Sequence, residues 1–216
     1  YQVLCPRINL ADESGRYCGE PAERDCDHCL LTQGNKFGVR SIRAWRESHA
    51  RMLRAADTVW VPDEDVSRRL RAYYPELECT VAPHEEFAPG EPREPRLQAL
   101  EPLRIAVIGA IGKVKGFDVL LACARDAQLR RLPLEFSLLG YSMNDKVLRD
   151  AGVLISGRYL EAEGAQKLAA MAPHAVWLPS LWPETYSYTL SLALQGGYPV
   201  FAFDIGAIGR RLRELG

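Results

Sequence analysis

The sequence lacks several features that would narrow its function directly. No apolar run approaches the roughly 18 residues of a membrane span, and no stretch has the pattern of a signal peptide. Neither sign of charge is in excess, since 27 lysines and arginines face 28 aspartates and glutamates for a net charge of −1. That balance argues against a nucleic-acid partner. Cysteine is sparse as well, and six in 216 residues are few enough for a reduced, cytoplasmic protein.

The composition is that of a globular α/β protein. Hydrophobic residues make up 47% of the chain and charged residues 25%, so the chain can bury a real core. Helix and strand patterns alternate on both sides of a proline-rich stretch, residues 83–102, which cannot form a regular helix or a central strand. We therefore predict the closing part of a Rossmann-like domain over 1–88, a linker over 89–103 and a second Rossmann-like domain over 104–216. The chain opens in mid-strand and ends directly after a helix, so we expect a piece of a longer protein.

The most informative stretch is residues 178–213. An apolar strand over 176–178 is stopped by proline, a helix is predicted over 189–195, and a second buried strand over 200–203. Glu184 stands in the turn before the helix, and parallel α/β sheets place their ligands at such turns. The backbone N–H groups that follow it, up to Ser187, would open the helix toward an anion.

A second ligand-side turn is predicted after a strand at 104–108. It reads Gly-Ala-Ile-Gly-Lys-Val-Lys-Gly over 109–116 and leads into a helix beginning at Phe117. A glycine-rich turn lets backbone amides approach phosphates, and lysine adds positive charge. The turn has neither the Walker pattern nor the dinucleotide fingerprint, so it is weak evidence by itself.

Together these segments resemble the C-terminal signature of family 4 (group 1) retaining glycosyltransferases, which have the GT-B fold. Pro183-Glu184 and the Gly-Tyr-Pro-Val segment at 197–200 match, as does Lys115 in the glycine-rich turn. Two positions depart from the family pattern. Leu192 stands where the family has a second Glu, and Ala110 where it has an Arg. Leucine cannot supply the ribose contact usually made by that Glu.

The resemblance implies a GT-B transferase that moves a sugar, with retention, from a UDP- or GDP-sugar to a glycan or lipid-linked glycan acceptor, as in polysaccharide biosynthesis. It implies no cofactor for catalysis, and it makes residues 1–88 part of the acceptor-side domain and residues 104–216 the nucleotide-sugar-binding domain. Glu184 would bind hydroxyls of the donor sugar, and Lys115 would stabilise the leaving diphosphate. The other donor-binding candidates come from ligand-side turns and the helix start: Gly112, Lys113, Gly116, Tyr141, Arg158, Tyr159, Tyr186, Ser187 and Tyr188. Glu161 and Glu163 are expected to be first-turn helix charges.

Two rival functions stay open. A binding or scaffold module that kept the fold and lost activity would explain Ala110 and Leu192. A sugar-nucleotide epimerase on the same frame would need acid and base residues in the cleft, and the sequence shows no convincing pair. Fold analogy does not separate these alternatives.

Four cysteines cluster near the start of the chain, at Cys5, Cys18, Cys26 and Cys29, the last two as Cys-Asp-His-Cys. The segment between them reads as a polar loop, which a structural zinc ion could hold. His28 is expected to point to solvent. Four free thiols on a surface loop, or a disulfide in an oxidised sample, are the alternatives.

Residues 39–56 are predicted to form an amphipathic helix, because Ile42, Trp45 and Met52 recur at helical spacing. Its other face carries four arginines. A solvated face is the favoured interpretation, and peripheral docking to an acidic membrane surface on the inner side is the alternative.

Overall fold

The computed structural model describes residues 1–95, 98–99 and 101–215. These residues form two compact units. The first consists of Tyr1–Glu86, Leu181–Tyr186 and Asp204–Gly216, and the second of Phe87–Ser180 and Ser187–Phe203. Each unit is described by itself below. Part of the predicted linker, at residues 96–97 and 100, lies outside the described residues, and the predicted domain limits stay predictions.

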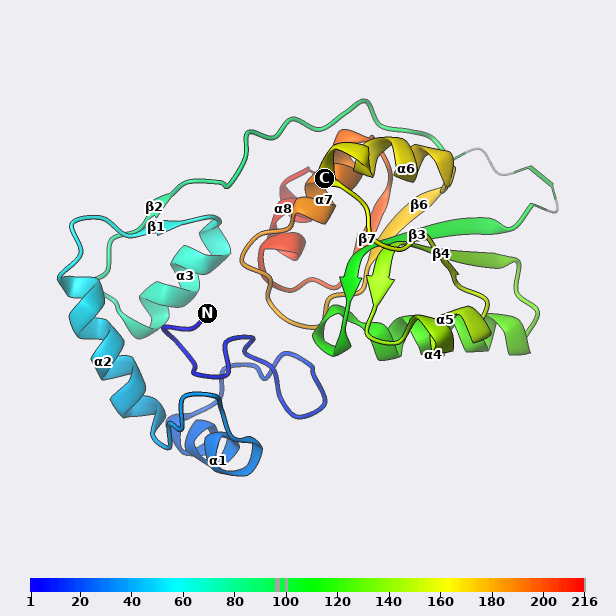
Figure 1. The fold of residues 1–216 in the computed structure, drawn as a ribbon. Coiled ribbons are helices and arrows are strands. Elements are labelled where there is room, and N and C mark those ends of the chain that lie inside the picture. The colour runs from blue at the N-terminus through cyan, green and yellow to red at the C-terminus, as the bar shows by residue number, and fades with distance from the viewer. Residues whose placement is uncertain (96–97, 100, 216) are drawn as a thin grey trace. The chain divides into compact units, whose positions relative to one another are not determined.

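The second unit is built on a parallel sheet of five strands in the order β5-β4-β3-β6-β7 (Figure 1). The predicted α/β class is therefore confirmed. The strands are β3 (Leu103–Ile111), β4 (Leu134–Ser142), β5 (Leu154–Ile155), β6 (Ala175–Leu178) and β7 (Val200–Ala202).

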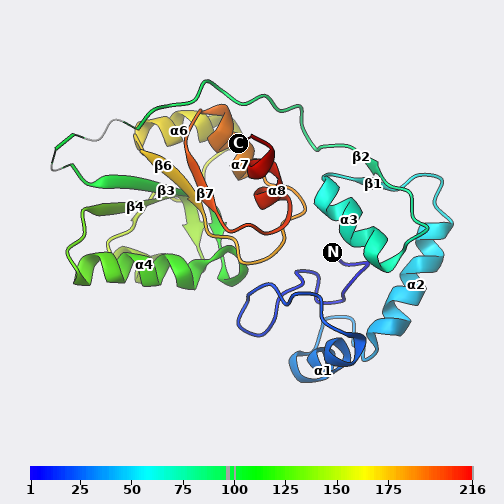
Figure 2. The same cartoon turned by 180° about the vertical axis from the view of Figure 1, so that it is seen from behind.

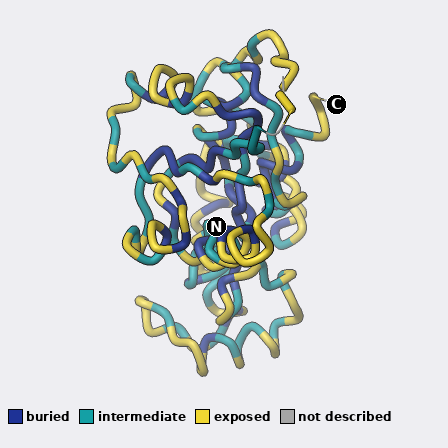
Figure 3. The backbone as a smooth tube through the Cα atoms, turned by 90° about the vertical axis from the view of Figure 1, so that its right-hand side faces the viewer, coloured by how far each residue is buried: buried dark blue, intermediate teal, exposed yellow. Residues whose placement is uncertain are grey.

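Helices cover both faces of this sheet. In Figures 1 and 2, α4 (Phe117–Leu129) and α5 (Asp145–Asp150) lie on one face, and α6 (Gly164–Ala170) and α7 (Tyr188–Gln195) on the other. Because both faces are covered, residues 105–111 of β3 and all of β6 are continuous apolar runs. The buried side chains of α4, Phe117 and Leu120 among them, pack against Val107 and Leu138 of the strands. In β3, Ala106, Val107 and Ile108 are buried; Figure 3 colours the backbone by how far each residue is buried.

Strands β3 and β4 are longer than the sequence predicts. Residues 109–111 and 140–142, expected to be turns, continue the two strands and pair with each other residue for residue. Gly140 has a φ of +134°, and a methyl group there would lie 2.1 Å from the carbonyl oxygen of Gly109. Two glycines side by side thus allow the strands to stay paired up to Ile111 and Ser142.

The first unit contains a two-stranded parallel sheet, β1 (Trp60–Val61) and β2 (Thr80–Val81). Its helices are α1 (Glu23–Gln33), α2 (Ile42–Arg54), α3 (Glu64–Tyr73) and α8 (Gly206–Leu215). Its core includes Leu53, Val61, Val66 and Leu70. The predicted helix 39–56 starts later than expected, because Ser41 caps it by accepting a hydrogen bond from the Ala44 N–H.

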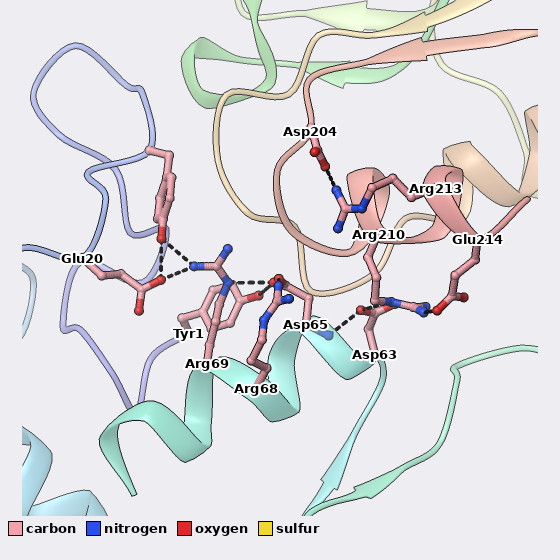
Figure 4. Close-up of polar contacts among 11 residues, drawn as sticks. Tyr1, Glu20, Asp63, Asp65, Arg68, Arg69, Asp204, Arg210, Arg213 and Glu214 are labelled. Atoms are coloured by element: carbon pink, nitrogen blue, oxygen red, sulfur yellow. Dashed lines mark hydrogen bonds and ion pairs between the residues drawn. The ribbon is translucent and has the colours of Figure 1, made fainter. Parts of the chain in front are cut away.

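Two buried carboxylates stand at the start of α3: Asp63 pairs with α8, and Asp65 pairs within α3 (Figure 4). Asp63, 1% exposed, caps α3 by accepting from the Asp65 N–H at 2.8 Å. It also takes a two-pronged contact from Arg210 of α8, at 2.8 Å from Nε and 2.7 Å from Nη2. Asp65 accepts from Arg69 Nε at 2.7 Å. Pairing is what allows carboxylates to be buried at this position.

None of the helices within the described residues combines the length and apolar character that crossing a membrane requires.

Candidate functional site

A hollow of about 480 Å³ lies at the carboxyl ends of the central strands in the second unit. Two residues come from the end of β3, two from the end of β4 and four from the segment after β5: Gly109, Ala110, Gly140, Tyr141, Arg158, Tyr159, Leu160 and Glu163. The volume is within the range of small-molecule sites. Its position is where parallel α/β sheets bind ligands.

The structure brings three predicted donor-binding residues together in this hollow. The Arg158 guanidinium lies 4.0 Å from the centre of the Tyr141 ring, a cation–π contact. Tyr159 is half-buried, and burial raises the pKa of its hydroxyl, with a smaller effect from the Glu161 charge. Aromatic and guanidinium planes are surfaces on which a nucleotide base can stack.

The start of helix α7 packs against the same strand end. A methyl group at Gly109 would lie 3.5 Å from Thr189 Cγ2, so the first turn of α7 is in contact range of β3. Ser187 is the N-cap, and its hydroxyl accepts from the Leu190 N–H at 3.3 Å. Tyr188, the first helical residue, is 54% exposed. The helix therefore presents its positive end at the carboxyl edge of the sheet.

The lysine turn follows β3 as a short 3-10 helix, Lys113–Lys115, flanked by Gly112 and Gly116. Gly116 has a φ of +83°, and a methyl group there would lie 2.1 Å from the Pro179 carbonyl oxygen. This close approach places the turn beside the end of β6 and requires glycine. Lys113 is exposed and Lys115 half-buried. The glycine-rich segment is thus shorter than predicted, because its first three residues belong to β3.

Glu163 is a lining residue that sequence reasoning missed. It was expected to be a helix-start charge, and it does accept from the Leu160 N–H at 3.3 Å and lie 3.6 Å from Lys167 Nζ. The fold also places it at the hollow. Nothing in the local sequence marks it, because acidic residues are common in the first turn of any helix.

Leu192, on α7, lies near Tyr159 of the hollow and Gly164. A methyl group at Gly164 would be 3.2 Å from Leu192 Cδ2 and equally 3.2 Å from Tyr159 Cε2. The leucine side chain therefore adds apolar surface where α6 and α7 meet.

Glu184 and Tyr186 belong to the first unit. Glu184 is 6% exposed, and its carbonyl oxygen accepts from the Ala207 N–H of α8 at 3.0 Å. The Tyr186 hydroxyl donates to Glu85 Oε1 at 3.2 Å, and the Arg211 guanidinium lies 4.8 Å from its ring centre. Helix α8 thus fixes the backbone of this turn. The donor-binding roles of Glu184 and Tyr186 stay predictions.

The zinc prediction is not supported. The end of the segment expected to be a loop, from Glu23 on, forms helix α1, which carries Cys26 and Cys29. Cys29 Sγ accepts a hydrogen bond from Arg7 Nη1 at 2.9 Å. Within the described part of the chain, no group of three or more His, Cys, Asp or Glu side chains is arranged to hold a metal ion. Cys5, Cys18, Cys26 and Cys29 are free, half-buried thiols. Burial raises the pKa of Cys5 and Cys18.

No protein-family model matches the sequence. No curated protein matches it.

Solved structures do resemble this chain. The pneumococcal O-GlcNAc transferase GtfA, in complex with UDP and GlcNAc, matches with a TM-score of 0.56 and 16% identity over 75% of this chain and 33% of that one. A TarM variant from S. aureus, in complex with fondaparinux, alpha-GlcNAc-glycerol and UDP, matches with a TM-score of 0.54 and 17% identity, over 79% of this chain and 34% of that one. The lipopolysaccharide outer core galactosyltransferase WaaB matches with a TM-score of 0.50 and 15% identity, over 72% of this chain and 45% of that one.

This chain spans less than half the length of each of these proteins. They are GT-B glycosyltransferases, and the chain shares their α/β fold with its parallel five-stranded sheet.

Proposed function

We propose that this chain carries the donor-binding part of a retaining, family-4-like GT-B glycosyltransferase that acts in the cytoplasm. The donor is a nucleoside-diphosphate sugar with a uracil or guanine base, and the acceptor is a glycan or lipid-linked glycan of polysaccharide biosynthesis. The observation that carries the proposal is the hollow at the ends of β3 and β4, with the start of α7 packed against Gly109. Two of the similar structures contain UDP, which supports a nucleotide as the ligand.

In this proposal the base lies in the hollow against Tyr141, Arg158 and Tyr159. The diphosphate lies at the first turn of α7 and the lysine turn, where the Ser187 and Tyr188 N–H groups and Lys115 provide positive charge. Gly112 and Gly116 allow the backbone of that turn to approach the phosphates, and Lys113 adds a second cation.

The reaction breaks the bond between the sugar C1 and the diphosphate oxygen. The acceptor hydroxyl forms the new bond on the face that the diphosphate leaves, and its proton passes to the departing phosphate oxygen. Glu184, three residues before Ser187, accepts hydrogen bonds from hydroxyl groups of the sugar and holds the ring in position for attack. Positive charge and helix dipoles then stabilise the charge that develops on the leaving diphosphate.

Lys115→Met tests the phosphate site. If Lys115 contacts the diphosphate, the variant binds UDP about tenfold or more weakly, whereas its binding of uridine is unchanged. Asp118→Asn, a change in the first turn of α4 near the lysine turn, serves as a charge control and should bind UDP no more weakly than the parent chain. Equal UDP affinity in the parent and in Lys115→Met would reject the phosphate contact.

Glu184→Gln in the full-length protein tests the sugar contact. We expect transfer to fall at least about a hundredfold with UDP affinity unchanged, because the interaction is needed at the reacting sugar. Full transfer activity in that variant would contradict the role.

A second candidate is a nucleotide-binding or scaffold module without transferase activity. It is favoured by Leu192, whose side chain meets Gly164 where the family pattern has a carboxylate, and by Ala110, which lines the hollow without a charge. Nucleotide binding without transfer in the full-length protein would establish this candidate.

A further inference from the structure

The hollow in the second unit contains a carboxylate without an assigned role. Among its described lining residues, the acidic side chain is that of Glu163, which faces the same hollow as Arg158 and Tyr159. A negative charge weakens phosphate binding, so a carboxylate at a nucleotide site is expected to bind a group of the ligand other than the phosphates. In a nucleoside diphosphate, the groups that donate hydrogen bonds are the ribose hydroxyls and the N–H groups of the base.

The Glu163 carboxylate is held in place by the chain around it. The Leu160 N–H donates to Oε2 at 3.3 Å, and Lys167 Nζ lies 3.6 Å from the same oxygen. A carboxylate offers about four acceptor positions, and both of these contacts use Oε2. The side chain is 44% exposed, so a ligand in the hollow can reach it. A fixed acceptor of this kind is preorganised for binding.

Glu163 also adjoins both the aromatic residues of the hollow and helix α7. Tyr159, four residues earlier in the chain, lines the hollow together with Tyr141. Gly164, the next residue, is in contact range of both Tyr159 and Leu192 on α7, the helix whose first turn packs on Gly109. Ribose connects the base to the phosphates. In the proposed site it must therefore lie between the aromatic residues of the hollow and the first turn of α7.

At this position α7 presents Leu192, which has no hydrogen-bonding group. On the facing segment, Glu163 lines the hollow and offers an acceptor for the ribose hydroxyls. A vicinal diol presents two donors at a spacing that one carboxylate can accept, as acidic residues do for ribose in other Rossmann-type sites.

We infer that the Glu163 carboxylate binds the ribose hydroxyls of the nucleotide and makes the site selective for ribonucleotides over deoxyribonucleotides. This inference rests on the proposed function, since it assigns one part of the same donor site. It also explains how a chain with Leu192 retains a ribose contact.

The test is a binding cycle measured by isothermal titration calorimetry. UDP and 2′-deoxy-UDP, and in parallel GDP and 2′-deoxy-GDP, are titrated into the parent chain, Glu163→Ala and Glu161→Ala. Glu161 is a matched control, because it carries the same charge in the same short helix, is exposed and does not line the hollow. We expect the parent chain and Glu161→Ala to bind the ribonucleotide about tenfold more tightly than the deoxynucleotide, the usual strength of a hydrogen bond to a charged group. In Glu163→Ala that ratio should fall to about one.

Comparing ratios within each variant removes any general effect of the substitution on the loop around Leu160. Circular dichroism and the melting temperature check that each variant is folded. A tenfold deoxy penalty that persists in Glu163→Ala would overturn the inference while leaving nucleotide binding intact. A change in the preference between UDP and GDP, with the deoxy penalty unchanged, would overturn it as well and assign Glu163 to the base. If no nucleotide binds the parent chain, the proposed function fails and the inference fails with it.

Discussion

The buried ion pair between Asp63 and Arg210 makes a prediction about stability that can be tested sharply. Asp63 is 1% exposed, and Arg210, at 20% exposed, reaches it with two nitrogens. The hydrogen bond to Asp63 also raises the pKa of Arg210. Replacing Arg210 with Met removes the cation and keeps a long side chain. The Asp63 carboxylate would then stay buried, and within the described residues it would keep the hydrogen bond from the Asp65 N–H.

The expected cost follows from that burial. Removing one partner of a buried pair costs about 3 to 5 kcal/mol, because the remaining charge is left without compensation. Water reaches part of Arg210, so we expect the lower end, about 3 kcal/mol. For a chain of this length, 1 kcal/mol shifts the melting temperature by about 2 to 4 °C. Arg210→Met should therefore melt about 6 to 12 °C below the parent chain.

Arg213→Met is the matched control, because it lies on the same helix and also pairs with an aspartate. That pair, with Asp204, has side chains that are 53% and 68% exposed, and exposed pairs contribute about 0 to 1 kcal/mol. Both variants are compared by urea denaturation followed by circular dichroism. In the double variant Asp63→Asn/Arg210→Met, the loss should be smaller than the sum of the two single losses, since neither charge is then left alone.

Equal melting temperatures for Arg210→Met and Arg213→Met would refute this reasoning. So would strict additivity in the double variant. The result also bears on the proposed role of Glu184, because α8 supports the Glu184 backbone through the Ala207 N–H.

Two further predictions concern the lysine turn and the thiols. Gly116→Ala should destabilise the protein by at least about 2 kcal/mol in urea denaturation, because its Cβ would overlap the Pro179 carbonyl oxygen and its φ is positive. Gly112→Ala is the control and should cost under about 1 kcal/mol, because no atom lies within 4 Å of a Cβ placed there. Equal losses of stability in the two variants would contradict this geometry. The thiols Cys5, Cys18 and Cys26 should react with iodoacetamide more slowly in the native than in the urea-unfolded chain at pH 8, because burial raises the pKa of each above its ordinary 9.0. Because the native thiols keep their protons to a higher pH than the unfolded ones, the stability that the three protonated thiols contribute is complete below about pH 9 and is lost as the pH rises above it. Native and unfolded alkylation rates that agree at every pH would refute the burial.

Much of the second unit could be predicted from the sequence, because local patterns determine it. Apolar runs bounded by glycine and proline identified the strands, and the start of α7 was predicted within one residue. The same ligand-side turns supplied Tyr141, Arg158 and Tyr159, which the fold brings together in one hollow. This worked because parallel strands carry their turns to one edge of the sheet.

The remaining features depend on contacts that a sequence does not display. Strands β3 and β4 continue through Gly109 and Gly140 because two glycines from different strands meet there, and either glycine alone reads as a turn. Helix α1 has one buried residue, Leu30, so it lacks the apolar stripe by which helices are recognised. Asp63 and Arg210 are 147 positions apart, and no local pattern links them.

The central claim is that the hollow binds a nucleoside diphosphate, and a thermal-shift titration tests it most directly. UDP, GDP, ADP and dTDP are each added at millimolar concentration to the parent chain and to Arg158→Ala, which removes the guanidinium that lies over Tyr141. A ligand that binds only the folded state raises the melting temperature by mass action, even when it binds weakly. We predict that UDP or GDP raises the melting temperature of the parent chain and has a smaller effect on Arg158→Ala. No shift with any nucleotide, or the same shift in both proteins, would contradict the claim.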